Sequence, residues 1–182
     1  MPGSKHTVGR IEQLTTGAPP AELLFDKAEI FLEAERRARD EWMTPPLVLQ
    51  ALDDFDLDPC APTARPWDTA KKHYSLADNG LLKPWEGRVW LNPPAASAAA
   101  WVQKLAEHGN GIALLPAKVD QQWFHDQVLR TARAVFFLHR LRGAAPANPP
   151  AGAFVLAAYS ERDMYVLKTC GLEGAFVECR NG

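Results

Sequence analysis

The chain has 182 residues, of which 47% are hydrophobic and 23% charged, so it is long enough to bury the core of one globular domain. Its formal net charge of -2 excludes a polycation, and any nucleic-acid contact must therefore come from a local basic patch. Three cysteines make no disulfide framework, no apolar run is long enough to cross a bilayer, and no signal peptide is evident. Together these features favour a reducing cytoplasm.

The first part of the chain predicts a leader followed by two helices. Residues 1–20 are rich in Gly, Pro, Ser and Thr with little periodicity, so we expect a flexible leader ahead of a single domain over residues 21–182. Residues 21–42 carry apolar side chains at helical spacing with charges between them, which is typical of a packing helix with one solvated face. Residues 44–55 predict a second helix, with Thr44 as its N-cap and Pro45 at its first position.

The rest of the chain alternates strands and helices. Short apolar runs that end in polar residues or proline predict buried parallel strands over residues 55–59, 88–94 and 111–117. Two further strands are expected over residues 133–141 and 153–159. Helices are expected over residues 97–109, with Gly109 as C-cap, and over residues 120–132, capped by Asp120. Residues 164–170 and 174–179 are expected to complete the edge of the sheet. This alternation predicts an α/β fold with a mainly parallel sheet flanked by helices.

The ends of the first three predicted strands carry the chemically informative residues. In open α/β sheets the site lies beyond the carboxyl ends of the strands, which is where Asp58, Asn92 and Pro116 fall. Asn92 opens an Asn-Pro-Pro sequence, which indicates methyl transfer to a planar amine. The alternative is a rigid turn from strand to helix with Asn92 as a helix cap. No metal is expected, because Cys170 and Cys179 lie too far apart for a zinc knuckle and no His pair accompanies them.

Four segments carry a family resemblance, in order along the chain: DEWMTP (40–45), FDLDPCA (55–61), DNGLLKPWEGRVWLNPP (78–94) and LLPAKVDQQWFH (114–125). Together they make the chain similar to the phage-type DNA N6-adenine methyltransferases, the phage Dam family, from about residue 40 to about residue 159. The resemblance implies a Rossmann-like fold, S-adenosylmethionine as cofactor and double-stranded DNA as partner. It also implies a phage or prophage origin, a bacterial host cytoplasm and a role in protecting DNA from restriction.

Asn92, Pro93 and Pro94 are the catalytic candidates that this resemblance implies. The lone pair of an adenine N6 is delocalised into the ring, which makes the amine a poor nucleophile. The side-chain carbonyl of Asn92 and the main-chain carbonyl of Pro93 can accept the two N6 hydrogens and aim that lone pair at the methyl group. The prolines stiffen the loop, so orientation and electrostatic placement do the chemistry without a general base.

Asp58, Pro59 and Cys60 are the first cofactor candidates. A carboxylate at the end of the first strand can accept hydrogen bonds from the methionine ammonium or the ribose of the cofactor, and an acidic residue followed by Pro is similar to the turn of such enzymes. Pro59-Cys60 leaves a rival open, because cytosine C5 methyltransferases attack the base with a Cys that follows a Pro. Cys60 lies within the cofactor turn itself, however, so we interpret it as a small buried residue.

Further cofactor candidates come from the segments at either end of the resemblance. Trp42, Thr44 and Pro45 are carried over as residues that close over the cofactor. Asp78 precedes Asn-Gly, so it either contacts the adenine edge of the cofactor or initiates a turn.

Lys118, Arg140 and Arg142 are the candidate DNA contacts. From residue 127 to residue 160 there is no Asp or Glu, which predicts a local positive face, although solvated arginines are the alternative. Two departures from the family pattern stand near the site: His139 precedes Arg140 where Gly is usual, and Ala95 follows Asn-Pro-Pro where an aromatic residue is usual. A methyltransferase-fold module that binds nucleic acid or protein without catalysis is therefore the alternative function.

Overall fold

The computed structural model describes residues 43–139 and 152–179. The predicted leader over residues 1–20 and the predicted helix over residues 21–42 lie outside the described residues, as do Trp42, Arg140 and Arg142. The boundary between leader and domain therefore stays a prediction.

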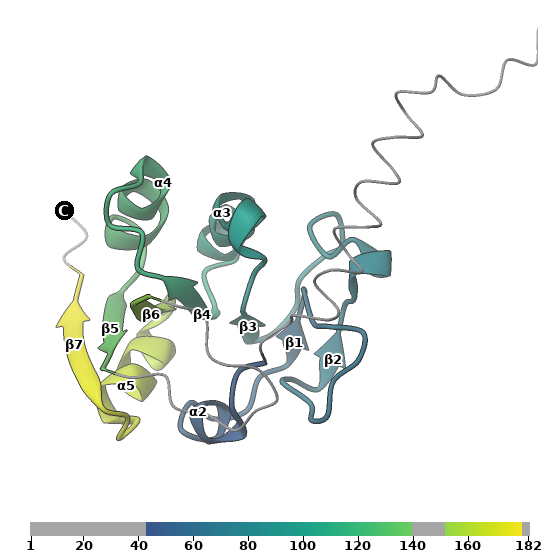
Figure 1. The fold of residues 1–182 in the computed structure, drawn as a ribbon, viewed down its shortest axis with the longest axis horizontal. Coiled ribbons are helices and arrows are strands. Elements are labelled where there is room, and N and C mark those ends of the chain that lie inside the picture. The colour runs from purple at the N-terminus through teal and green to yellow at the C-terminus, as the bar shows by residue number, and fades with distance from the viewer. Residues whose placement is uncertain (1–42, 140–151, 180–182) are drawn as a thin grey trace, which may run out of the picture. The chain divides into compact units, whose positions relative to one another are not determined.

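Within the described residues, the chain forms a seven-stranded sheet in the order β2-β1-β3-β4-β6-β5-β7 (Figure 1). The strands are β1 (Leu57–Asp58), β2 (Lys72–His73), β3 (Val89–Leu91), β4 (Gly111–Pro116), β5 (Ala134–Leu138), β6 (Phe154–Ala158) and β7 (Gly174–Glu178). β1 to β4 pair in parallel, and β6 lies antiparallel between β4 and β5. β1 to β5 therefore share one direction, whereas β6 and β7 run the opposite way. The predicted α/β class with a mainly parallel sheet is confirmed.

Helices cover both faces of this sheet. They are α2 (Pro46–Gln50), α3 (Ala98–His108), α4 (Gln122–Phe124), which continues as a π-helix (His125–Leu129), and α5 (Glu161–Thr169). Figure 1 shows α3 and α4 on one side of the sheet and α2 and α5 on the other. The core follows the same division, with one apolar cluster beneath α3 and α4 and a second beneath α2 and α5.

β3 illustrates how one strand serves both clusters. Successive side chains of a strand point to opposite faces of the sheet. Val89 and Leu91 pack with Trp101 and Leu105 on the α3 face. Trp90, between them, packs on the face that α2 and α5 cover. This explains why the strand is apolar throughout and why its sequence lacks the alternation of a half-exposed strand.

α3 forms as its sequence predicts. Ala98, Trp101, Val102 and Leu105 recur at helical spacing and are its buried residues. Gly109 ends the helix in the left-handed region, with φ of 71°, and its N–H donates to the carbonyl of Leu105 at 2.8 Å. Glycine adopts this conformation without a Cβ clash, so the predicted C-cap is confirmed.

The start of α2 differs from the prediction. Pro45 is the N-cap, Pro46 stands at the first helical position, and the Thr44 side chain makes no capping bond. The helix ends at Gln50, short of the predicted end at residue 55. Asp53 has a φ of 61°, a left-handed conformation that turns the chain out of the helix before β1 begins. The hydroxyl of Thr44 therefore forms its hydrogen bond with Asn92, outside α2.

Three other elements also differ from the sequence prediction. The segment 164–170, predicted as a strand, is part of α5, whose N-cap Ser160 accepts from the main-chain N–H of Asp163 at 3.1 Å. Its β-branched and aromatic content favours a strand, but the cap and the buried pair Val166 and Leu167 suit a helix. Asp120 caps nothing, since α4 begins at Gln122 with Gln121 as N-cap. β2 was not predicted, because two polar residues give no apolar pattern.

A buried ion pair fixes the amino ends of the strands. Arg88, which precedes β3, donates from Nε to Asp163 Oδ1 at 2.6 Å, and these side chains are 2% and 0% exposed. Arg88 also donates from Nη1 to the carbonyl of Leu52 at 2.7 Å, while Asp163 Oδ2 accepts the N–H of Gly111 at 2.8 Å. The pair therefore joins β3, β4, α5 and the end of the α2 segment.

Candidate active site

The carboxyl ends of β1, β3 and β4 meet at one edge of the sheet, which we call the carboxyl edge (residues 58–60, 92–94 and 116–118). β1 and β3 are parallel neighbours, with Leu57 opposite Val89, and β4 continues the same arrangement. The thiol of Cys60 donates to the main-chain oxygen of Asn92 at 3.4 Å. The structure thus brings together the two segments that the sequence singled out, and Cys60 is half-buried between them.

The Asn92 side chain is held by its nitrogen. Nδ2 donates to the hydroxyl of Thr44 at 3.4 Å, and Asn92 is half-buried. Among the described residues, no donor reaches Asn92 Oδ1 or the main-chain oxygen of Pro93, whereas the main-chain oxygen of Pro94 accepts the N–H of Ser97 at 3.1 Å. Two oxygens on a proline-stiffened loop, one on half-buried Asn92 and one on buried Pro93, therefore have no hydrogen-bond donor among the described residues.

Asn92 does not cap a helix. The short 3₁₀ turn Ala95–Ser97 has Pro94 as its N-cap, and α3 has Ser97. Neither helix start receives a capping bond from a side chain. The helix-cap part of the alternative interpretation is therefore wrong, whereas the segment 92–94 does form the turn from β3 to the helices that follow.

Asp58 shapes the turn that follows β1. Its Oδ1 accepts the N–H of Cys60 at 3.1 Å, and its Oδ2 accepts the hydroxyl of Thr69 at 2.5 Å. The residue is 3% exposed, and within the described residues no cation forms an ion pair with it. Burial raises the pKa of Asp58 from its ordinary value of 3.8 to about 6, because the low-dielectric interior disfavours the ionised form. Asp58 is thus a buried carboxyl group that has no ion-pair partner among the described residues, although the charge of Arg65 partly offsets the effect of burial on its pKa.

The loop that contains Asp78 packs against this turn. Asp78 is exposed, and its Oδ2 accepts from the N–H and the hydroxyl of Ser75 at 2.8 and 2.7 Å, which is the turn interpretation. Gly80 lies so close to Pro59 that a Cβ would stand 2.0 Å from the Pro59 carbonyl oxygen, so no larger residue fits. Lys104 of α3 donates to the main-chain oxygen of Leu81 at 2.6 Å and holds the loop in place.

Comparison with known families shows which family has this sequence. The family model described as DNA N-6-adenine-methyltransferase (Dam) matches residues 33–168, which include every segment of that edge. The chain belongs to the Dam family. Comparisons with curated proteins and with solved structures returned no match. The mixed α/β sheet is consistent with a methyltransferase-like fold, and family membership assigns DNA adenine methylation as the general activity.

The burial of Asp58 predicts how the stability of this Dam-family protein depends on pH. Because the folded-state pKa of Asp58 lies above 3.8, the folded protein holds the proton more tightly than the unfolded chain. Protonated Asp58 therefore contributes to the free energy of unfolding, and this contribution is fully present below pH 3.8. It is lost as the pH rises through about 6, and the whole loss amounts to about 3 kcal/mol. Asp58→Asn keeps an acceptor for Cys60, and its amide can donate to the Thr69 hydroxyl.

We expect Asp58→Asn to be more stable than the wild type near neutral pH, with a difference that shrinks on acidification. Urea unfolding of both proteins at about pH 4 and about pH 7 measures this. A stability difference that is the same at both pH values would contradict the assigned cause.

Ala95 leaves the position after Asn-Pro-Pro without an aromatic ring. It is exposed at the start of the 3₁₀ turn. Phe124 does not replace the ring, because it is fully buried in the core beneath α3 and α4. Trp123 is half-buried and packs edge-on against Phe124, with ring centroids 5.6 Å apart. Both rings therefore serve core packing beneath α3 and α4.

The described part of the acid-free segment (residues 127–160) is less positive than its sequence predicts. Lys118 is exposed beyond β4 at the carboxyl edge. Arg130 pairs with Asp126 at 2.5 Å, and Arg133 pairs with Glu161 at 3.5 Å. These acidic partners lie outside the acid-free segment and reduce the positive charge of its described part.

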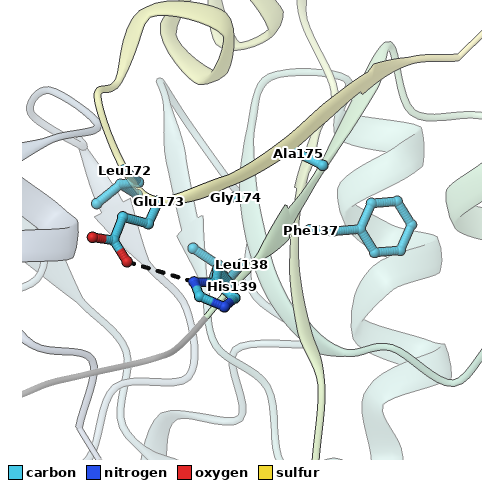
Figure 2. Close-up of a pocket in the computed structure, with 7 residues that line it drawn as sticks. All are labelled: Phe137, Leu138, His139, Leu172, Glu173, Gly174 and Ala175. Carbon is cyan, nitrogen blue, oxygen red and sulfur yellow. Dashed lines mark ion pairs between the residues drawn. The ribbon is translucent and has the colours of Figure 1, made fainter.

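A hollow lies at the carboxyl end of β5, beside the start of β7, and none of the predicted site residues lines it. It is lined by Phe137, Leu138, His139, Leu172, Glu173, Gly174 and Ala175. Figure 2 shows His139 facing Glu173, and the two form an ion pair at 3.6 Å. Across the described ranges, no cluster of three or more His, Cys, Asp or Glu side chains could hold a metal ion, and no helix is long and apolar enough to span a membrane.

Proposed function

We propose that this Dam-family protein transfers a methyl group from S-adenosylmethionine to the N6 amine of a flipped-out adenine in double-stranded DNA. The observation that carries this proposal is the pair of available oxygens, Asn92 Oδ1 and the Pro93 carbonyl, at the carboxyl edge. An amine with two hydrogens matches two neighbouring acceptors.

The two oxygens would act on the nucleophile. By accepting the N6 hydrogens they draw the amine lone pair out of conjugation and fix the direction in which it points. The pyramidal amine is then the reactive form, and its surplus proton leaves to solvent after transfer. Pro93 and Pro94 restrict the loop, so little reorganisation is needed when the base arrives.

The residues at the end of β1 fit a cationic cofactor. S-adenosylmethionine would supply a methyl group on a positively charged sulfur and also carries an ammonium group. Asp58 is buried and has no ion-pair partner among the described residues, and a positive group bound next to the turn of Pro59 and Cys60 would add to the charge of Arg65 in favouring its ionised form. Asp78 is engaged by Ser75, and any contact of Asp78 with the cofactor adds to that bond.

The missing aromatic ring predicts a weak enzyme. Extruding a base from the duplex costs a few kcal/mol, and stacking on an aromatic side chain offsets about 1–3 kcal/mol of such a cost. Ala95 cannot stack, so a rate deficit of about ten- to a hundredfold follows, since about 1.4 kcal/mol is a factor of ten.

We expect Ala95→Tyr to raise the rate of methylation of duplex DNA by about ten- to a hundredfold. Steady-state methylation by the two proteins, side by side, measures this. Ala100→Tyr adds the same side chain at an exposed position of α3 and serves as the matched control. An unchanged or lower rate in Ala95→Tyr, with cofactor binding preserved, would show that the missing ring is not what limits this site.

The proposal also includes the DNA contacts and the biological setting. Lys118 would contact phosphates beside the site, with Arg140 and Arg142 as further candidates outside the described residues. Phage or prophage origin, a bacterial host cytoplasm and protection of DNA from restriction remain part of it.

Incubation with labelled S-adenosylmethionine and unmethylated duplex DNA, followed by nucleoside analysis, tests the proposal. N6-methyladenine is the expected product. Label in 5-methylcytosine would favour the rival chemistry at Cys60, and an absence of label would favour the binding module without catalysis.

A further inference from the structure

The contacts of Thr44 differ from both roles that its sequence predicts. It was expected to close over the cofactor, yet it is 1% exposed, which leaves almost no surface for a ligand. Its hydroxyl does not cap α2 either. Instead, Thr44 Oγ1 accepts from Nδ2 of Asn92 at 3.4 Å, across 48 residues of sequence.

In the structure this contact takes up the nitrogen end of the Asn92 amide. The terminal torsion of an Asn side chain is broad and roughly two-fold, so a free amide presents its nitrogen and its oxygen in turn. With Nδ2 engaged by Thr44, Oδ1 is the end left without a partner among the described residues. Only that orientation offers an acceptor to an amine.

Thr44 is itself held in place. The indole Nε1 of Trp67 donates to the main-chain oxygen of Thr44 at 3.1 Å, and Pro45 and Pro46 restrict the backbone that follows. Trp67 lies two residues before Thr69, which donates to Asp58. The segment that contains Trp67 and Thr69, between β1 and β2, therefore holds both Thr44, which contacts Asn92, and Asp58.

We propose that Thr44 is a positioning residue, which orients Asn92 through its hydroxyl, and that Trp67 secures Thr44. The inference rests on the proposed function, because the amide orientation matters only if Asn92 Oδ1 receives an amine hydrogen. Thr44 acts through Asn92 and touches neither the base nor the cofactor.

Three variants test this role. Thr44→Val keeps the shape and the burial but removes the acceptor, and we expect kcat to fall about three- to tenfold, as the loss of one hydrogen bond predicts. The dissociation constant of the cofactor, measured by calorimetry, should stay within about twofold, because Thr44 does not contact it. Thr44→Ser restores the hydroxyl and should recover kcat. Thr169→Val, at the exposed end of α5, controls for the same substitution away from the site.

A second readout does not depend on activity. The side-chain amide signals of Asn92 in a nitrogen-15 correlation spectrum, assigned by their absence in Asn92→Ala, should shift in Thr44→Val and return in Thr44→Ser. If the wild type transfers no methyl group, the proposed function fails while this spectrum still decides the Thr44 contact. Unchanged amide signals in Thr44→Val would overturn the inference. So would weaker cofactor binding with kcat preserved at saturating cofactor, because Thr44 would then be a cofactor contact.

Discussion

Replacing Asn92 with Ala should lower kcat by about a hundred- to a thousandfold, the range seen when one preorganised hydrogen-bonding group is removed from a reaction site. Asn92 Oδ1 has no hydrogen-bond donor among the described residues, and it is the acceptor that we propose for the amine. Cofactor affinity should change little, because the residue acts on the nucleophile. Single-turnover methylation and calorimetric titration of the cofactor measure the two quantities separately.

Asn110→Ala provides the matched control for this experiment. Asn110 precedes β4 at the amino ends of the strands, where its Nδ2 donates to the carbonyl of Gly87 at 2.9 Å. Removing the same atoms there should leave methylation near the wild-type rate. Wild-type methylation by Asn92→Ala would show that the proposed role of the amide is wrong.

The second large effect concerns stability. Replacing Asp163 with Ala should lower the free energy of unfolding by about 3–5 kcal/mol, because it leaves Arg88 buried without its counter-charge. Arg88 is 2% exposed, and no residue that the structure describes accepts a hydrogen bond from its Nη2. The substitution also removes the acceptor for the N–H of Gly111 at the start of β4. Urea unfolding monitored by tryptophan fluorescence provides the measurement.

Asp126→Ala is the surface control for the buried pair. Asp126 pairs with Arg130 at 2.5 Å, but the two side chains are 42% and 72% exposed. Such exposed pairs contribute about 0–1 kcal/mol, so this variant should unfold close to the wild type. If Asp163→Ala is no more destabilising than Asp126→Ala, the buried pair does not hold the strand ends together as we describe.

The sequence predicted every described strand except β2, and the signal was clearest for strands buried on both faces. β3, β4 and β6 lie within continuous apolar runs, and such runs arise only when helices cover both sides of a sheet. β2 gave no signal, because Lys72 and His73 enter the sheet through main-chain pairing with β1. The residues 164–170 were predicted as a strand, since Tyr165 and Val166 favour strands by propensity while the Ser160 cap decides for a helix.

The sequence predicted those candidate site residues that lie at the carboxyl ends of strands. Asp58 and Asn92 were found because each follows an apolar run, and parallel strands bring their carboxyl ends together. Thr69, Trp67 and Lys104 were missed, because their partners Asp58, Thr44 and the Gly80 loop are fixed only by the folded chain. The hydrogen bond between Thr44 and Asn92 joins residues 48 positions apart, and no pattern in the sequence predicts it.

Transfer of labelled methyl from S-adenosylmethionine to unmethylated duplex DNA by the wild-type protein, resolved by nucleoside, tests the central claim most directly. The geometry at Asn92 and Pro93 predicts that label accumulates in N6-methyladenine and in no other nucleoside. It also predicts that Asn92→Ala, assayed at the same protein concentration, accumulates label at least about a hundredfold more slowly. A properly folded wild-type protein that binds the cofactor and leaves adenine unlabelled would contradict the account.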